Sequence, residues 1–189
     1  MRAERGSWLV PAIAGLWLVG LSLGARAIYH FSTDRGTTGA TPERWPRTSA
    51  LRPAATGATA VVFLHPDCPC SRASVHELES AMRMLPLGAR VIAVFEGMGD
   101  GALWAAVGTS SIERVLDDGT ENARFGARTS GYAVVYDARG ALAFRGGITA
   151  SRGHVGDNMG RQKFAAALQG ISHGDHHPVF GCALTSEPR

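Results

Sequence analysis

The chain has 189 residues, of which 45% are hydrophobic and 19% charged, and it carries a formal net charge of +3 with a pI near 9.1. This length suits one well-buried domain with an appendage, and the composition excludes a mainly disordered chain. The positive charge comes from scattered arginines, without a basic run or interleaved aromatic residues. We therefore expect no nucleic-acid partner.

An apolar segment near the N-terminus predicts a membrane anchor. No charged residue lies between Ser7 and Ala25, and two arginines precede the segment. Its length is close to the ~20 residues that an α-helix needs to cross a bilayer. We predict a cytoplasmic N-terminus over residues 1–6 and a single-pass transmembrane anchor over residues 7–27.

A cleaved signal peptide is the alternative, because Ala25-Arg26-Ala27 has the A-x-A pattern of a signal peptidase site. We favour the anchor, since the apolar run is longer than the ~7–15 residues usual in a signal peptide. Both interpretations export the domain to a compartment where disulfides can persist. The predicted location is the cell inner membrane, with the domain facing the periplasm or the cell exterior.

Residues 28–57 are rich in Thr, Pro, Gly, Ala and Arg, and their prolines interrupt any regular period. This composition predicts a linker that holds the domain off the membrane. Trp45 is the exception, since an aromatic residue flanked by prolines could dock on the folded domain. We expect the domain over residues 58–172 and a His- and Cys-containing tail over residues 173–189.

The domain begins with a strand–helix–strand pattern. Val61–Leu64 is an apolar run typical of a buried strand, and Pro66 ends it. Apolar residues at helical spacing predict a helix over residues 71–84, and Arg90–Phe95 predicts a second strand. This order implies two parallel strands joined by a right-handed crossover.

The second half of the domain contains a β-hairpin and further short elements. Tyr132–Tyr136 and Ala141–Arg145 are strands joined by a four-residue turn that carries Asp and Gly. The other expected elements are a short helix over 101–107, a strand or helical turn over 112–116, a helix over 121–127 that Gly126 ends, and a helix from its N-cap Asp157 to Leu168.

Two of the three cysteines, Cys68 and Cys70, lie where the first strand meets the first helix. A helix N-terminus presents free N–H groups and a partial positive charge, which lower the pKa of a thiol there. A buried free cysteine is often only a small apolar residue. Two cysteines separated by Pro69 in a turn nevertheless favour thiol or metal chemistry.

This order of elements, with cysteines at the first strand-to-helix turn, resembles the thioredoxin fold over about residues 58–170. The segments His65–Arg72, Gly146–His154, Gly156–Asn158 and Val179–Cys182 together resemble the membrane-anchored bacterial thioredoxin-like proteins labelled RedB. The resemblance implies an α/β, thioredoxin-like fold with a mixed central sheet flanked by helices.

The resemblance also shows departures from ordinary thioredoxins. Cys68 falls on the nucleophile position, Ser71 occupies the position of the resolving cysteine, and Gly131 stands where thioredoxins carry a cis-proline. An active site of the ordinary thioredoxin type is therefore not expected, because the dithiol and the substrate-binding proline are both altered.

The residues permit thiol–disulfide exchange on extracytoplasmic partner proteins without a cofactor. Cys68 would attack as a thiolate, and Cys70 or Cys182 would resolve the mixed disulfide. A Cys68–Cys70 bond would close a very small, strained ring. Arg72 could lower the pKa of Cys68 or simply be exposed, while His65, which precedes Pro66, could tune the thiolate or pack as an ordinary histidine.

Copper binding is the alternative interpretation, similar in outline to the Sco proteins. The three thiols suit Cu(I) or Zn, and His65, His154, His176 or His177 could be a fourth ligand. The C-x-C spacing is tighter than zinc sites usually have, and a solvated turn is the simpler interpretation of the His173–His177 cluster. A redox-inactive docking module is a third possibility.

The glycine-rich run Gly146–Gly160 matches neither a P-loop nor a dinucleotide fingerprint. We expect a hydrogen-bonded loop packed near the cysteine turn, either positioning Cys182 or contacting a partner. The polar residues of this loop are Ser151, Arg152, His154, Asp157 and Asn158.

Overall fold

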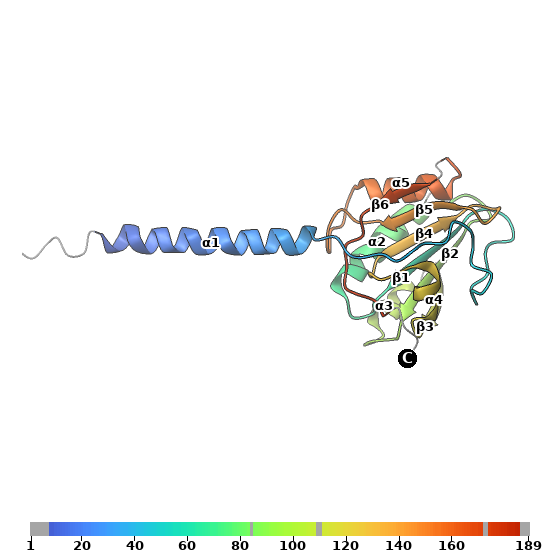
Figure 1. Cartoon of the computed structure of the whole chain (residues 1–189), viewed down its shortest axis with the longest axis horizontal. Helices are drawn as coiled ribbons and strands as arrows, with labels where there is room; N and C mark the ends of the chain where they lie inside the picture. Colours follow the sequence, from blue (N-terminus) through green and yellow to red (C-terminus); the bar gives the residue numbers. More distant parts are fainter. Residues whose placement is uncertain (1–7, 84, 109–110, 172–173, 186–189) are drawn as a thin grey trace, which may run out of the picture. The chain divides into compact units, whose positions relative to one another are not determined.

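The computed structural model describes residues 8–83, 85–108, 111–171 and 174–185. It divides into two compact units, Met1–Asp34 and Arg35–Arg189. In the first unit, helix α1 (Leu9–Thr33) is 25 residues long, and Figure 1 shows it as one continuous helix. By length and composition α1 can cross a membrane, and it continues six residues past the predicted end of the anchor at residue 27.

The second unit is built on one mixed, six-stranded sheet with the order β3-β2-β1-β4-β5-β6 (Figure 1). β1 is parallel to β2 and antiparallel to β4, and β4 pairs with β5 in the predicted hairpin. The strands are β1 (Thr59–Leu64), β2 (Arg90–Glu96), β3 (Glu113–Asp117), β4 (Tyr132–Tyr136), β5 (Leu142–Gly147) and β6 (Asp175–His177). The predicted thioredoxin-like order is confirmed, the ambiguous segment near residue 112 is a strand, and β6 was not predicted.

The helices match the predicted positions within a few residues. They are α2 (Pro69–Met82), α3 (Ala102–Val107), α4 (Thr120–Phe125) and α5 (Met159–Leu168). α2 begins two residues earlier than expected, because Pro69 supplies the fixed φ angle that suits a first helical residue. The predicted N-cap of α5 was wrong by one residue: the side chain of Asn158, not of Asp157, accepts from Arg161 N at 2.8 Å.

Apolar residues pack on both faces of the sheet. One core cluster includes Leu78 of α2 and Phe164 of α5. The other includes Phe125 of α4, Tyr136 of β4 and Leu51, which precedes β1. Alternate residues of β1, β2 and β4 therefore enter different layers, which explains why β1 and β4 are buried along their whole length.

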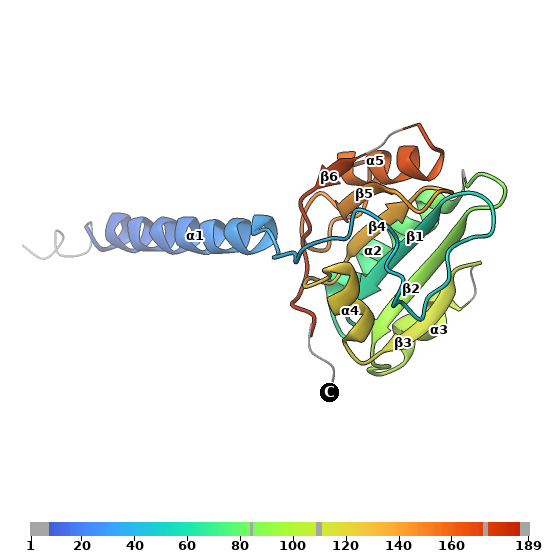
Figure 2. The ribbon, with the colours of Figure 1, turned by 45° about the vertical axis from the view of Figure 1, so that its right-hand side comes forward.

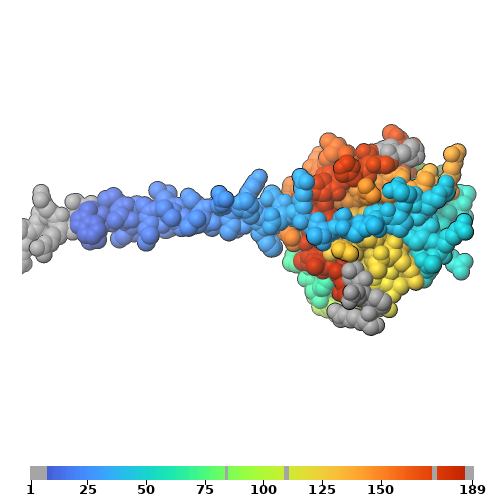
Figure 3. Space-filling view, in the orientation of Figure 1, coloured from blue at the N-terminus to red at the C-terminus, as the bar shows by residue number. Residues whose placement is uncertain are grey.

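The chain between α1 and β1 packs on the domain. Figures 2 and 3 show this segment running across the face of the second cluster. Trp45 meets Phe125 and Tyr136 edge-to-face at ring-centroid distances of 5.3 and 5.4 Å, which confirms its predicted docking. The predicted linker over residues 28–57 is therefore corrected: its first residues belong to α1, and residues 35–57 cover a sheet face that α4 alone leaves open.

Candidate active site

The cysteine turn lies between β1 and α2. Cys68 is the N-cap of α2 in an extended conformation (φ −87°, ψ 121°), and Pro69 and Cys70 follow in the first helical turn. Both cysteine side chains are buried, with Cys68 3% and Cys70 8% exposed. The amides of Cys70 and Ser71 donate to the Cys68 sulfur, so the helix N-terminus acts on this thiol as the sequence predicted.

Cys182 reaches the turn from a distant part of the sequence. The C-terminal strap, residues 178–185, pairs with the chain before β4: Thr129 and Ala183 form an antiparallel bridge, and Ser130 N donates to Cys182 O at 2.8 Å. Both the thiol and the amide N–H of Cys182 donate to the sulfur of Cys68. The structure thus brings all three cysteines together, as free thiols.

Opposing effects act on the pKa of Cys68. Burial favours the neutral thiol and raises the pKa, whereas hydrogen bonds from Cys182, Cys70 and Ser71 stabilise the thiolate and lower it. The hydrogen bonds outweigh burial, and the pKa lies below its usual range. Cys68 is therefore the thiol best prepared to act as a nucleophile.

The two neighbouring thiols shift the other way. Burial, followed by the negative charge on Cys68, raises the pKa of Cys70. Burial and the hydrogen bond to Cys68 raise the pKa of Cys182 to about 12. Cys68 is accordingly the most readily ionised of the three thiols, and the thiols of Cys70 and Cys182 both donate to its sulfur.

Arg152 is the cation beside these thiols. Its charge lowers the pKa of both Cys70 and Cys182, against the larger effect of burial. One guanidinium nitrogen donates to Gly181 O, next to Cys182 in the strap, and the amide of Gly153 donates to the sulfur of Cys70. The predicted loop near the cysteine turn is confirmed. Within it, Arg152 helps to position Cys182 through its hydrogen bond to Gly181 O.

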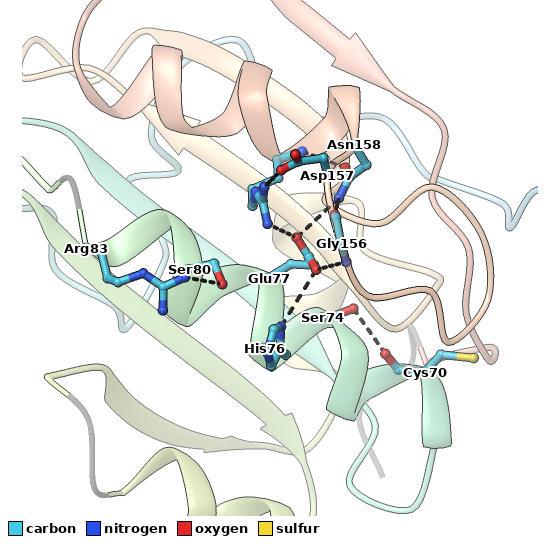
Figure 4. A network of polar contacts seen from close by, with 10 residues as sticks. Cys70, Ser74, His76, Glu77, Ser80, Arg83, Gly156, Asp157 and Asn158 are labelled. Atoms are coloured by element: carbon cyan, nitrogen blue, oxygen red, sulfur yellow. Dashed lines mark hydrogen bonds and ion pairs between the residues drawn. The ribbon is translucent and has the colours of Figure 1, made fainter.

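A buried carboxylate fastens the same loop to α2 (Figure 4). Glu77 is 0% exposed; it accepts from Gly156 N at 2.7 Å and from Asn158 Nδ2 at 3.3 Å. Arg161 Nη1 lies 2.7 Å from the same carboxylate, and Arg161 Nη2 pairs with Asp157. The sequence analysis missed Glu77, although a charged residue on the apolar side of a helix was a signal that could have found it.

The hydroxyl groups of Ser71 and Ser130 hold the cysteine turn through hydrogen bonds to the backbone of His65. Ser71 Oγ donates to His65 O at 2.7 Å and lies 2.7 Å from Ser130 Oγ, which also accepts from His65 N at 2.9 Å. Ser130 is completely buried and was not singled out from the sequence. The hydroxyl at the thioredoxin resolving position is therefore part of the scaffold of the turn.

Gly131 follows Ser130 with φ +86°, and its amide donates to Phe63 O at 2.8 Å. A Cβ at this position would lie 2.7 Å from Ser74 Oγ. The left-handed backbone favours glycine, and the tight approach adds to that preference.

The remaining predicted site residues lie around the turn. Arg72 is exposed, which is one of its two predicted roles, and Arg152 is the cation that acts on Cys70 and Cys182. His65 is half-buried, and its Nδ1 accepts from Asp67 N at 3.2 Å. Pro66 is buried and lies between His65 and Asp67, just after the end of β1.

The four histidines proposed as metal ligands lie on different segments: His65 follows β1, His154 lies in the loop after β5, and His176 and His177 lie in β6. His154 and His176 are exposed, and His177 is half-buried with its Nδ1 3.0 Å from Pro178 O. Within the described ranges no group of three or more His, Cys, Asp or Glu side chains is arranged to hold a metal ion. His173 lies outside the described residues.

No protein-family model matches the chain, and no curated protein matches its sequence. A solved structure of a hypothetical protein from Sinorhizobium meliloti 1021 is similar, with a TM-score of 0.53, 19% identity and coverage of 82% of this chain and 97% of that one. An uncharacterized conserved protein from Geobacillus kaustophilus gives a TM-score of 0.56 at 17% identity, covering 83% and 94%.

A secreted Mycobacterium tuberculosis disulfide oxidoreductase homologous to Escherichia coli DsbE aligns with a TM-score of 0.45 and 16% identity, over 60% of this chain and 81% of that one. The order of strands and helices, with the cysteine turn at the start of α2, gives this chain a thioredoxin-like fold.

Proposed function

We propose that the protein is a membrane-tethered, extracytoplasmic, RedB-like protein that exchanges thiols and disulfides with partner proteins. Cys68 is the nucleophile and Cys182 the resolving thiol. The observation that carries the proposal is the double hydrogen bond from the Cys182 thiol and amide to the Cys68 sulfur. The segments His65–Arg72 and Val179–Cys182, which carry part of the RedB resemblance, meet at this contact.

The exchange proceeds in two steps, and the thiols of the site and of the partner account for all its protons and electrons. The Cys68 thiolate attacks one sulfur of a partner disulfide; a mixed disulfide forms, and the other partner sulfur leaves as a thiolate that takes up a proton. Cys182 then loses its proton and attacks Cys68. The products are a Cys68–Cys182 disulfide and a partner with two thiols, so the partner is reduced by two electrons and this chain is oxidised by two.

Cys182 suits the resolving step better than Cys70. Cys68 and Cys70 are the N-cap and the second residue of one helix, and a bond between them would have to close a very small ring around Pro69. Cys182 belongs to a separate strap, so its sulfur can approach Cys68 without unwinding α2. Cys70 then remains a protonated neighbour that stabilises the thiolate.

The test uses the full chain, reduced, metal-free and in detergent micelles. Insulin, a disulfide-bonded protein, is added, and the thiols it gains are counted by alkylation. We expect exchange in the wild type and in Cys70→Ser, no exchange in Cys68→Ser, and an accumulating Cys68–insulin mixed disulfide in Cys182→Ser. Equal exchange in all variants would overturn the proposal.

A parallel measurement addresses the copper interpretation, for which the clustered thiols are soft ligands. The same preparations are titrated with Cu(I) and analysed for bound metal. Stoichiometric copper that is lost in Cys182→Ser, together with failure to exchange with insulin, would favour copper handling. Exchange without stoichiometric metal supports the thiol–disulfide reaction.

A further inference from the structure

An open cavity of about 750 Å³ lies at the β6 edge of the sheet, and none of its lining residues belongs to the cysteine turn. Residues 35–41 form one wall. Gly36 N donates to Val179 O at 2.8 Å where this segment crosses the chain after β6 (Figure 2), and Gly39 N donates to Gly126 O at 2.8 Å. The wall is therefore fixed to the domain, and the cavity is a formed part of the fold.

Three cationic side chains line the cavity, and they come from three different parts of the chain: Arg35 from the wall, Arg145 from β5 and Lys163 from α5. No carboxylate in the described part of the chain lines it. Two carboxylates approach from outside the lining, Glu43 at 3.8 Å from Arg145 and Asp175 at 3.7 Å from Lys163. Both separations exceed a hydrogen bond, and two carboxylates do not cancel three cations.

The half-buried His177 reports the same positive surroundings. Burial lowers its pKa, and the nearby charges of Lys163 and His176 lower it further, against hydrogen bonds to the carbonyls of Pro178 and Gly147 that raise it. Both histidines line the cavity. A positive potential of this kind, inside a concave surface, favours the binding of an anion.

Chain connectivity holds the wall of the cavity close to the bilayer that α1 is proposed to span. The charge-free run ends at Ala25, so α1 leaves the hydrocarbon near Arg26, and the rise from there to Thr33 is about 10 Å. A headgroup layer is of similar thickness, about 5–8 Å. Arg35 follows Thr33 by only two positions, which places the first cation of the cavity at the level of the headgroups or just above it.

We propose that this cavity binds the phosphate group of an anionic phospholipid headgroup. Arginine recognises phosphate through paired N–H donors and lysine as a point charge. The volume lies within the range of about 300–1,000 Å³ that small-molecule sites have, so a whole headgroup has room there. The inference rests on the membrane tethering in the proposed function and adds a second attachment of the domain to the bilayer.

Lys163 makes a specific test possible, because it is the one lysine in the sequence. An amine-directed acetylating reagent therefore modifies only Lys163 and the N-terminal amine. The full chain is placed in nanodiscs of phosphatidylcholine alone, or of phosphatidylcholine and phosphatidylglycerol in equal parts, in a phosphate-free buffer. Mass spectrometry follows the acetylation of each amine with time.

We expect phosphatidylglycerol to slow the acetylation of Lys163 about tenfold, the factor for about nine-tenths occupancy of the site. The N-terminal amine should slow less than about twofold, since salt screens an exposed charge. Arg35→Gln with Arg145→Gln should restore most of the Lys163 rate. The matched pair, Arg47→Gln with Arg139→Gln, removes the same charge at exposed positions outside the cavity and should keep the protection.

Both double variants should exchange thiols with insulin at the wild-type rate, which verifies that they fold. Equal slowing of Lys163 and of the N-terminal amine would overturn the lipid site, because surface charge alone would explain it. Loss of protection in both double variants would overturn it as well.

Two further results separate the source of the phosphate and the tethering. Protection of Lys163 by inorganic phosphate or glycerol phosphate in phosphatidylcholine nanodiscs, without any effect of phosphatidylglycerol, would overturn the lipid as the ligand. A chain that does not elute with the nanodiscs would instead overturn the membrane tethering in the proposed function. The thiol chemistry is judged separately, by the exchange with insulin.

Discussion

Ser71 and Ser130 face each other beneath the cysteine turn, with their hydroxyl oxygens 2.7 Å apart and both side chains buried. Ser130 Oγ is also the acceptor for His65 N. Ser130→Ala leaves these buried groups without that partner, and we expect it to lower the free energy of unfolding by about 1–3 kcal/mol. Urea denaturation of the full chain in detergent measures the change.

Ser80→Ala is the matched control for Ser130→Ala. Ser80 accepts from Arg83 at an exposed site on the same helix as Ser71, so its loss should change the stability by less than about 0.5 kcal/mol. Equal losses in the two variants would mean that the hydroxyl pair does not hold the turn.

Glu77→Gln tests the carboxylate that fastens the glycine-rich loop to α2. The substitution leaves the Arg161 guanidinium, whose side chain is 20% exposed, without its buried partner. Breaking such a pair costs about 3–5 kcal/mol when both groups are buried. Because Arg161 is partly exposed, we expect Glu77→Gln to lower the free energy of unfolding by an amount near the lower end of this range. Asp157→Asn removes an ion pair at a 90% exposed side chain and should cost less than about 1 kcal/mol.

Trp45→Ala tests whether the segment before β1 is part of the domain. The half-buried indole packs against Phe125 and Tyr136, and its loss should cost about 2–4 kcal/mol. Arg47→Ala, an exposed change in the same segment, should be nearly neutral. A chain that begins at Thr59 should expose this sheet face and aggregate; a monomeric fragment with wild-type stability would contradict the account.

Cys182→Ala tests the origin of the lowered pKa of Cys68. The variant keeps the amide donor and loses the thiol donor, so the Cys68 pKa should rise toward its ordinary value. Because the thiolate is the reactive form, alkylation of Cys68 by iodoacetamide at pH 7 should slow several-fold, and its pH profile should move to higher pH. Both chains carry Cys70→Ser so that a single thiolate is followed.

An unchanged or lower pH midpoint in Cys182→Ala would show that burial beside Cys182 matters more than its hydrogen bond. The direction of the shift therefore separates the two opposing effects on Cys68.

Local patterns in the sequence predicted most of the fold and the position of the cysteine turn. Apolar runs identified β1 and β2, the Asp–Gly turn identified the hairpin, and the strand–helix junction placed Cys68 at a helix N-terminus. Each of these features depends on neighbours within a few residues. Periodicity and turn chemistry were therefore sufficient.

The missed features depend on contacts between distant segments. Residues 35–57 have the composition of a linker, and only the uncovered face of the sheet explains why they pack. β6 has three residues, too few to show a period. Arg72 is close to Cys68 in sequence, but Arg152 is the cation that the loop after β5 brings to the thiols.

The disulfide formed on oxidation tests the central claim most directly. The full chain in detergent is oxidised with glutathione disulfide, alkylated and digested with trypsin, which cleaves after Arg72 and Lys163 and so separates Cys182 from the cysteine turn. The account predicts a peptide pair joined through Cys68 and Cys182, located by fragmentation. A Cys68–Cys70 bond within one peptide, or three thiols that stay reduced, would contradict it.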